Sequence, residues 1–275
     1  MTRERVSDML GERLDSLRAA RPRVHCIANY VTANDCANLL LACGASPIMA
    51  DDPQETAQIT SACAGLAVSL GTPSARRLEG MALAAKKAAE LGIPAVLDPV
   101  GVGGSDLRME AARRMLGEAK FTAIRGNGAE IAALNSLTLN GAGIDDVSPC
   151  ADGLETAQRL ARRTGAVVIL SGERDIVTDG RTAYRVSNGH EMMRLVTGAG
   201  CMLTALVGAY LAANPGQALD AALAAVCAMG VCGERAHARL KPGEGNASYR
   251  NHLIDAVYAL TPQDLEREAR YAVYG

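Results

Sequence analysis

Short apolar runs alternate along much of the chain with longer segments in which apolar residues recur at helical spacing. The apolar runs have the length and β-branched content of buried strands, and they lie at residues 24–27, 47–50, 66–70, 95–97, 121–124 and 166–170. Between them, segments such as 74–91 and 105–119 place Ala, Leu and Met at helical spacing, with Lys, Arg and Glu in the intervening positions. Strands that alternate with helices in this way indicate an α/β fold with a mostly parallel central sheet and helices on both faces.

After residue 171 the pattern changes to shorter pieces, around 175–184 and 185–193, in which polar and apolar residues alternate. We expect antiparallel strands here, joined by turns at Asp179-Gly180 and Asn188-Gly189. Long helical segments then close the chain. No low-complexity linker, internal repeat or change in composition marks a boundary, so we expect one domain over residues 1–275, with a surface loop at 135–152.

Residues 195–219 carry no charge and therefore resemble a membrane-spanning segment. Gly198 and Gly200 precede the apolar run, however, and Asn214-Pro215-Gly216 ends it. This leaves about 14 helical residues, or roughly 21 Å at about 1.5 Å each, against a bilayer core of roughly 30 Å. We therefore expect a buried core helix and no membrane association.

Charge and cysteine content exclude several classes of protein. The chain has 28 Lys plus Arg against 30 Asp plus Glu, a formal net charge of −2, so no broad attraction to nucleic acid or anionic membrane is expected. The eight cysteines fall singly, without CxxC pairs, and no apolar signal segment opens the chain. We expect reduced thiols and a cytoplasmic protein.

Polar or glycine-rich residues follow the predicted strands. In parallel α/β sheets, ligands bind beyond the carboxyl ends of the strands, so these residues are expected at one rim. They are Asn29, Asp51, Asp52, Gly71-Thr72, Asp98, Arg125-Gly126-Asn127 and Ser171-Gly172-Glu173.

The sequence TGAGC at 197–201 comes directly before the uncharged helix. Glycines let the backbone approach a ligand closely, and the first turn of a helix offers unpaired N–H groups and a partial positive charge to an anion. We therefore expect an anion hole for a phosphoryl group, formed by Gly198, Ala199, Gly200 and Cys201. The alternative is that the glycines serve only tight packing between loop and helix.

Cys201 is the candidate catalytic residue. In the first turn of a helix the dipole favours the thiolate and so lowers the thiol pKa below its reference value of about 8.5. A thiolate would accept a proton from a substrate hydroxyl. The alternative is an inert cysteine of the core.

Four further residues carry candidate phosphate and metal chemistry. Arg125 has a planar fork that matches phosphate oxygens, with a surface ion pair as the alternative. Asn127 and Glu130 can organise hydrated Mg²⁺, although their spacing is also that of a helix cap. Asp98 is a carboxylate at a strand end, where aspartates also cap turns. His25 lies inside the first predicted strand, and we expect it to be a hydrogen-bonded core residue.

Read together, these motifs resemble the hydroxyethylthiazole kinase family across nearly the whole chain. The resemblance is carried by PRVHCIANYV at 22–31, ANLLLACGASPIM at 37–49, LDPVGVG at 97–103, IRGNGAE at 124–130 and the glycine motif that ends in Cys201. Related sugar kinases usually carry Asp where Cys201 stands, whereas Cys is typical of the thiazole kinases. Ser69 stands where an Asn is common and Pro73 where an apolar residue is more usual, which leaves details of the substrate pocket open.

The resemblance implies a ribokinase-like fold and ATP- and Mg²⁺-dependent phosphorylation of 4-methyl-5-(2-hydroxyethyl)thiazole at its primary alcohol, a step of thiamine salvage. It also implies a homotrimer with active sites between subunits. By analogy with the family, the thiazole contacts are Asn29, Val31, Met49 and Gly198; the ATP contacts are Arg125 and Ser171; and the metal and phosphate network includes Asp98 and Glu130.

Other functions stay open at this stage. The same fold can phosphorylate another small alcohol, such as a hydroxymethylpyrimidine. A regulatory module that binds nucleotide or thiazole without turnover is a second alternative, and a thiol-based redox or metal protein is a third.

Overall fold

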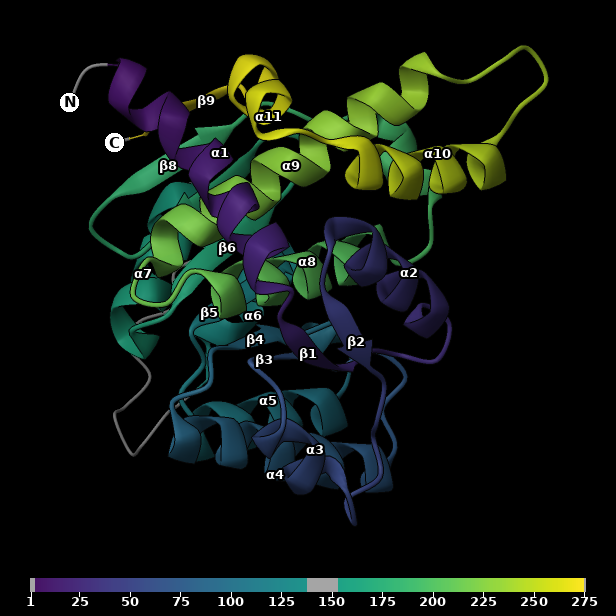
Figure 1. Cartoon of the computed structure of the whole chain (residues 1–275). Helices are drawn as coiled ribbons and strands as arrows, with labels where there is room; N and C mark the ends of the chain where they lie inside the picture. Colours follow the sequence, from purple (N-terminus) through teal and green to yellow (C-terminus); the bar gives the residue numbers. More distant parts are fainter. Residues whose placement is uncertain (1–2, 138–152, 275) are drawn as a thin grey trace.

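A single nine-stranded sheet runs through the computed structural model, which describes residues 3–137 and 153–274 (Figure 1). The strand order is β2-β1-β3-β4-β5-β6-β7-β8-β9; the first six strands are parallel and the last three are added antiparallel. The strands are β1 (Arg23–Ile27), β2 (Ser46–Ile48), β3 (Gly65–Ser69), β4 (Ala95–Asp98), β5 (Ala123–Asn127), β6 (Val167–Ser171), β7 (Asp175–Thr178), β8 (Ala183–Val186) and β9 (Tyr271–Val273).

Helices cover both faces of this sheet, as Figure 1 shows. Those on one face are α1 (Arg3–Ala20), α2 (Ala33–Cys43), α8 (Ala199–Ala213), α9 (Ala218–Ala238), α10 (Asn246–Ala259) and α11 (Pro262–Glu268). Those on the other are α3 (Thr56–Ser61), α4 (Ala75–Leu91), α5 (Asp106–Glu118), α6 (Gly128–Asn135) and α7 (Gly153–Thr164). Short 3₁₀ helices, η1 (Val102–Gly104) and η2 (Glu191–Leu195), precede α5 and α8.

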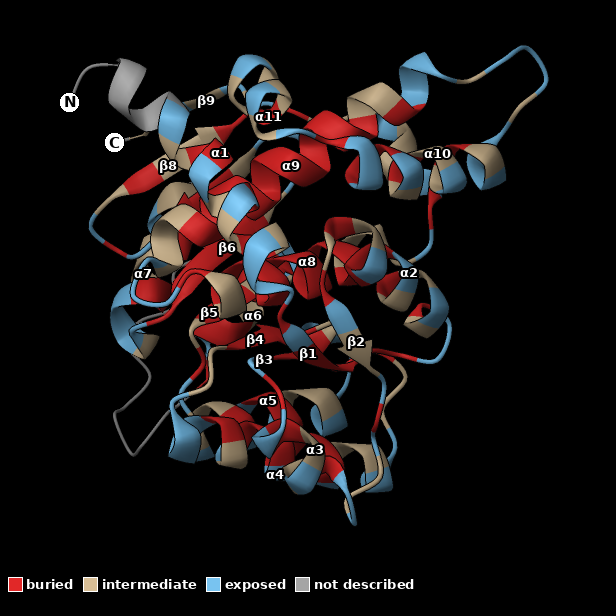
Figure 2. Cartoon of the chain, in the orientation of Figure 1, coloured by how far each residue is buried: buried red, intermediate tan, exposed pale blue. Residues whose placement is uncertain are grey.

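Each face of the sheet has its own apolar core, because side chains alternate along every strand. Val96 of β4 packs toward α8, whereas Leu97 packs toward α4 and α5. The buried positions lie along the sheet and on the helix faces turned toward it (Figure 2). The mostly parallel α/β fold expected from the sequence is confirmed.

The predicted parallel strands and helices are found within a few residues of their expected bounds. Two predicted helices begin directly after their expected first residues, since Ser74 and Ser105 are the N-caps of α4 and α5 and accept hydrogen bonds from the N–H groups of Arg77 and Arg108. The helix predicted near residue 200 is α8, with almost every residue buried. Within the described ranges, no helix is both long and apolar enough to span a bilayer.

Of the two turns predicted to join antiparallel strands after residue 171, one is found and the other is wrong. The turn at Asp179-Gly180 does join β7 to β8, but no hairpin forms within 185–193, because β8 ends at Val186 and η2 follows it. On its other side β8 pairs with β9, from the end of the chain. The side chain of Asn188 hydrogen-bonds to Glu234, Glu268 and Arg270 instead of forming a hairpin turn. The predicted loop at 135–152 falls outside the described residues from 138 onward.

Candidate active site

Side chains at the carboxyl ends of β3 to β6 point to the same face of the sheet. Because directions alternate along a strand, a residue two positions after one that packs on α8 also faces α8. Ala67, Val96, Ala123 and Ile169 belong to the core on the α8 side. Their successors at this spacing are Ser69, Asp98, Arg125 and Ser171, which the sheet therefore presents to the start of α8.

His25 shows the opposite outcome of the same alternation. Its neighbours Val24 and Cys26 face α8, so its ring lies on the other face, where it contacts the Thr60 hydroxyl at 2.8 Å and the Ala50 carbonyl at 2.8 Å. Burial lowers its pKa, so the ring is neutral and Nε2 donates to the carbonyl. The prediction of a hydrogen-bonded core histidine is confirmed.

A charged network joins the ends of β4, β5 and β6. The Arg125 guanidinium donates to Ser171 Oγ at 2.7 Å and lies 3.7 Å from Asp98 Oδ1. Asp98 is fully buried, and its Oδ2 accepts a hydrogen bond from the Thr204 hydroxyl of α8 at 3.1 Å. Burial raises the pKa of Asp98 to about 6; Arg125 opposes this rise and the nearby Glu130 charge adds to it.

Arg125 and the start of α8 are in close contact because residue 200 is glycine. A Cβ at Gly200 would lie 2.3 Å from Arg125 Nη1. Gly198, the N-cap of α8, has φ +86°, and a Cβ there would lie 2.2 Å from Thr32 Cγ2. Gly198 is thus required by its backbone conformation and by Thr32, whereas a side chain at residue 200 would displace the Arg125 guanidinium.

The Cys201 thiol lies among polar groups of three elements. Asn29 Nδ2 donates to its Sγ at 3.3 Å, Ser69 Oγ lies 3.7 Å from it, and the Asp98 carboxylate is near enough for its charge to act on the thiol. Burial and then the Asp98 charge raise the pKa of the thiol to about 12. The expected lowering by the helix dipole is therefore wrong for this state of the protein, because burial in an apolar helix outweighs it.

Glu130 is a capping residue. Asn127 Oδ1 accepts from the Glu130 N–H at 3.0 Å while Glu130 Oε2 accepts from the Asn127 N–H at 2.8 Å, so the capping-box alternative is confirmed. Its Oε1 also accepts from the Gly101 N–H at 2.9 Å. No cluster of three or more His, Cys, Asp or Glu side chains with metal-binding geometry occurs in the described part of the chain.

The residues expected to contact the thiazole differ in exposure. Asn29 is buried beside Cys201, and within the described structure its Oδ1 has no hydrogen-bond partner. Val31 and Met49, by contrast, are 55% and 39% exposed, after β1 and β2 respectively. Within this chain, then, the structure joins Asn29 to the polar network but leaves Val31 and Met49 open to solvent.

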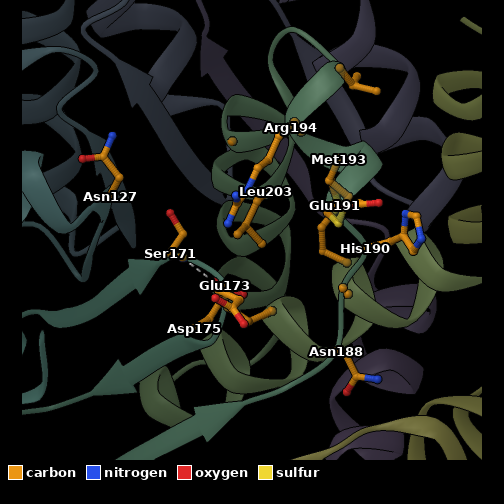
Figure 3. A pocket seen from close by; sticks show the side chains of 18 of the residues that line it. Asn127, Ser171, Glu173, Asp175, Asn188, His190, Glu191, Met193, Arg194 and Leu203 are labelled. Carbon is orange, nitrogen blue, oxygen red and sulfur yellow. Dashed lines mark hydrogen bonds between the residues drawn. The ribbon is translucent and has the colours of Figure 1, made fainter. Parts of the chain in front are cut away.

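A cavity of about 780 Å³ opens from Arg125 and Ser171 along the glycine motif. Its apolar wall comes from η2, α8 and α9 and includes Met193, Leu203, Val226 and Met229. Figure 3 shows Ser171 on one side of the cavity and Met193, Glu191 and His190 on the other. A space of this size, with a charged end and an apolar end, fits a ligand of nucleotide size.

Sequence reasoning missed two contacts of this site. Thr204 lies three residues after Cys201, a helical spacing that could have placed both on one face of α8. The lining from η2 and α9 has no local signal, because it forms only when the 187–196 segment folds against the last helices.

The fold itself recurs in solved structures. A ribokinase-like superfamily protein from Enterococcus faecalis superposes with a TM-score of 0.61 at 14% identity, covering 93% of this chain and 95% of that one. This likeness establishes the fold alone. The parallel sheet with helices on both faces therefore belongs to the ribokinase-like fold class.

Sequence comparison identifies the family within this class. The model of the hydroxyethylthiazole kinase family matches residues 14–263. The hydroxyethylthiazole kinase of Clostridium acetobutylicum is 47% identical over 97% of this chain and 100% of its own length, and that of Cereibacter sphaeroides is 44% identical over 96% and 98%. The structure of the Pyrococcus horikoshii hydroxyethylthiazole kinase superposes with a TM-score of 0.85 at 32% identity, over 97% of this chain and 99% of that one.

The chain therefore belongs to the hydroxyethylthiazole kinase family. It is an enzyme of the kinase class, and the family resemblance read from the sequence motifs is confirmed.

Proposed function

We propose that the protein transfers the γ-phosphoryl group of ATP to the primary alcohol of 4-methyl-5-(2-hydroxyethyl)thiazole, as one kinase domain over residues 1–275 acting in thiamine salvage in the cytoplasm. The observation that carries the proposal is the convergence of Asp98, Arg125 and Cys201 at the glycine-bounded start of α8. In a member of this family, that convergence supplies charge neutralisation and backbone N–H donors at one point.

The nucleotide occupies the cavity beside β5 and β6. Arg125 and Ser171, 2.7 Å apart, lie at its charged end and bind the phosphates, and the base lies against the apolar wall from η2 and α9. Arg194 also lines the cavity and supplies a second positive charge. The N–H groups of Gly198, Ala199, Gly200 and Cys201 receive the transferring phosphoryl group.

Asp98 and Glu130 belong to the metal network in this proposal. Asp98 fits a hard cation, because its buried Oδ1 has no hydrogen-bond partner within the described structure. Glu130 fits less directly, since both of its oxygens already accept backbone N–H groups, and we assign it a contact through water. Mg²⁺ bound here would neutralise the phosphate charge that develops during transfer.

The alcohol binds beside the segments that follow β1 and β2. Asn29 and Gly198 contact the thiazole from within one subunit, and Val31 and Met49 complete the site where a neighbouring subunit of a homotrimer covers them. Their 55% and 39% exposure in the single chain supports this assignment, because apolar side chains at a binding site are expected to be covered.

Cys201 is the candidate proton acceptor for the alcohol. A thiol whose pKa is raised to about 12 is protonated at neutral pH, so in this state Cys201 cannot accept a proton. Because phosphoryl transfer passes through a loose transition state, little base catalysis is needed before the new bond forms. We therefore assign most of the rate to positioning and electrostatics, and to Cys201 a small share.

An Mg²⁺-dependent assay of ADP release against a panel of thiazole, pyrimidine and sugar alcohols tests the proposal. The hydroxyethylthiazole should give the highest kcat/KM. Preference for a hydroxymethylpyrimidine would replace the substrate, and nucleotide binding without ADP release with any alcohol would identify a regulatory module instead.

A further inference from the structure

Arg77, in the first turn of α4, uses its whole guanidinium to hold backbone at the strand ends. Nη2 donates to the Ala28 carbonyl at 2.5 Å, and Nη1 donates to the Thr72 carbonyl at 2.8 Å and to the Gly71 carbonyl at 3.2 Å. Nη1 also reaches the Thr72 hydroxyl at 3.0 Å, and Nε pairs with Asp51 at 2.9 Å. One side chain thus ties together the segments that follow β1, β2 and β3.

These segments carry the acceptor side of the site. Ala28 directly precedes Asn29, which donates to Cys201 Sγ. Gly71 packs so closely on Asn29 that an added Cβ would lie 2.7 Å from Asn29 Nδ2. Arg77 therefore fixes Asn29 from two directions, through the peptide that precedes it and through the glycine that packs against it.

Thr72 gives a reason why such a clamp is needed. Its φ is +46°, a left-handed conformation that is strained for a β-branched residue. The following Pro73 further restricts the backbone at this point. Two hydrogen bonds from Arg77 hold Thr72 in this conformation, through its carbonyl and its hydroxyl.

The neighbouring Arg76 makes a different kind of contact. Among the residues that the structure describes, its hydrogen-bonded partner is Asp52; their side chains are 62% and 37% exposed, whereas the side chain of Arg77 is only 13% exposed. An exposed ion pair of this kind contributes little to stability or shape. Arg76 is therefore a control on the same turn of α4 with the same charge.

We propose that Arg77 is a positioning residue for the alcohol acceptor: it holds the loops after β1, β2 and β3 in the arrangement that binds the alcohol, and it acts on Asn29 without touching the reacting atoms. The assignment of the acceptor to this side rests on the proposed function. Arg77 makes no contact with Arg125 or Ser171 in the described structure, so the nucleotide side should not depend on it.

Steady-state kinetics of the full-length protein test this inference, with alcohol and ATP varied separately for wild type, Arg77→Lys, Arg77→Ala and Arg76→Ala. Because small displacements of binding groups are costly, we expect the KM for the alcohol to rise about tenfold in Arg77→Lys and up to about a hundredfold in Arg77→Ala. The KM for ATP should stay within about twofold, and Arg76→Ala should match wild type for both substrates. Lysine retains part of the effect because it can still reach Asp51 and one carbonyl.

An unchanged KM for the alcohol in Arg77→Ala would overturn the inference, as would parallel rises in both KM values. If the alanine variant does not fold, Arg77→Lys decides the question. Amide hydrogen exchange at residues 28–33 and 70–73 needs no turnover: faster exchange in Arg77→Lys than in Arg76→Ala is expected, and equal exchange would contradict the clamp. Should the wild type phosphorylate a different alcohol, the proposed function fails, and the same kinetics with that alcohol still test Arg77.

Discussion

Asp98 carries an ionised carboxyl group in a place that disfavours charge. Its side chain is fully buried, and burial raises its pKa to about 6 despite the Arg125 guanidinium at 3.7 Å. Against a reference value of about 3.9, this rise costs about 3 kcal/mol of stability at neutral pH. A buried charge that lowers stability in this way is expected of a residue that serves function rather than folding.

We therefore predict that Asp98→Asn is more stable than wild type but less active. At pH 7.5 the free energy of unfolding should rise by about 1–2 kcal/mol, since part of the gain is offset by leaving Arg125 without its carboxylate. The gain should shrink as the pH falls from about 6 to about 4, where wild-type Asp98 takes up its proton. kcat should fall about a hundredfold.

Urea unfolding of both proteins at pH 7.5 and pH 4.5, without nucleotide or metal, measures these changes. A stability difference independent of pH would show that the Asp98 charge is not its cause. In the wild type, kcat/KM should also decline below pH 6 as Asp98 becomes protonated.

Cys201 permits a second prediction at this scale. Since its thiol is protonated at neutral pH, Cys201→Ala should lose no more than about tenfold in kcat. Cys201→Asp should keep or exceed the wild-type rate, because a carboxyl group starts from a pKa of about 3.9 and can accept a proton near neutral pH. Single-turnover rates with saturating substrates decide this, and a loss beyond a thousandfold in the alanine variant would restore the cysteine as an essential base.

At the scale of elements, the sequence predicted the six parallel strands and one rim for the polar residues that follow them. Side chains alternate between the two faces of the sheet along β4 and β5. Once one residue of a strand is known to face α8, the residue two positions further on must face α8 too, and this places Asp98 and Arg125 on one face. The contacts of Arg77 could not be predicted in this way. Three of its five acceptors are backbone carbonyls, at residues 28, 71 and 72, and a carbonyl has no sequence signature.

The start of α8 gives an element-scale prediction. Gly200→Ala should lower kcat about a hundredfold, because its Cβ would lie 2.3 Å from Arg125 Nη1 and displace the guanidinium from Asp98 and Ser171. Gly104→Ala is the control, since a Cβ there meets nothing within 4 Å. Kinetics with both substrates and thermal unfolding of both variants measure the effect. A Gly200→Ala enzyme as active as the control would mean that Arg125 relaxes without loss.

The same scale shows where prediction from sequence ends. The pairing of β8 with β9 joins residues 183–186 to 271–273, and nothing local specifies it. The Asn188-Gly189 pair carries a hairpin signal, yet the Asn188 side chain is committed to Glu234, Glu268 and Arg270. Tertiary contacts therefore override the local turn preference.

Over the whole molecule, the sheet separates the two substrates of the proposed reaction. The acceptor side lies at β2, β1 and β3, the nucleotide side begins at β5 and β6, and Asp98 of β4 stands between them. The contacts of Arg77 support the acceptor side at one edge of the sheet, and the contacts of Asn188 support the nucleotide side near the other edge. From β3 to β8 are five strand spacings, or roughly 24 Å at about 4.8 Å each, so the two supports are independent.

This separation predicts opposite kinetic effects from the two edges. Asn188 is buried, and it fixes the wall of the nucleotide cavity by accepting from the Arg270 N–H at 2.5 Å and donating to the Glu268 carbonyl at 2.9 Å. Asn188→Ala leaves these groups unpaired and frees the segment that leads into η2, so the KM for ATP should rise about tenfold while the KM for the alcohol stays within about twofold. Arg77→Lys should do the reverse, and the double variant should show the product of both effects in kcat/KM. Bisubstrate kinetics on the wild type, the two single variants and the double variant measure these effects. If the KM for the alcohol rose in Asn188→Ala as much as the KM for ATP, the two halves of the sheet would be coupled through Asp98 rather than supported separately.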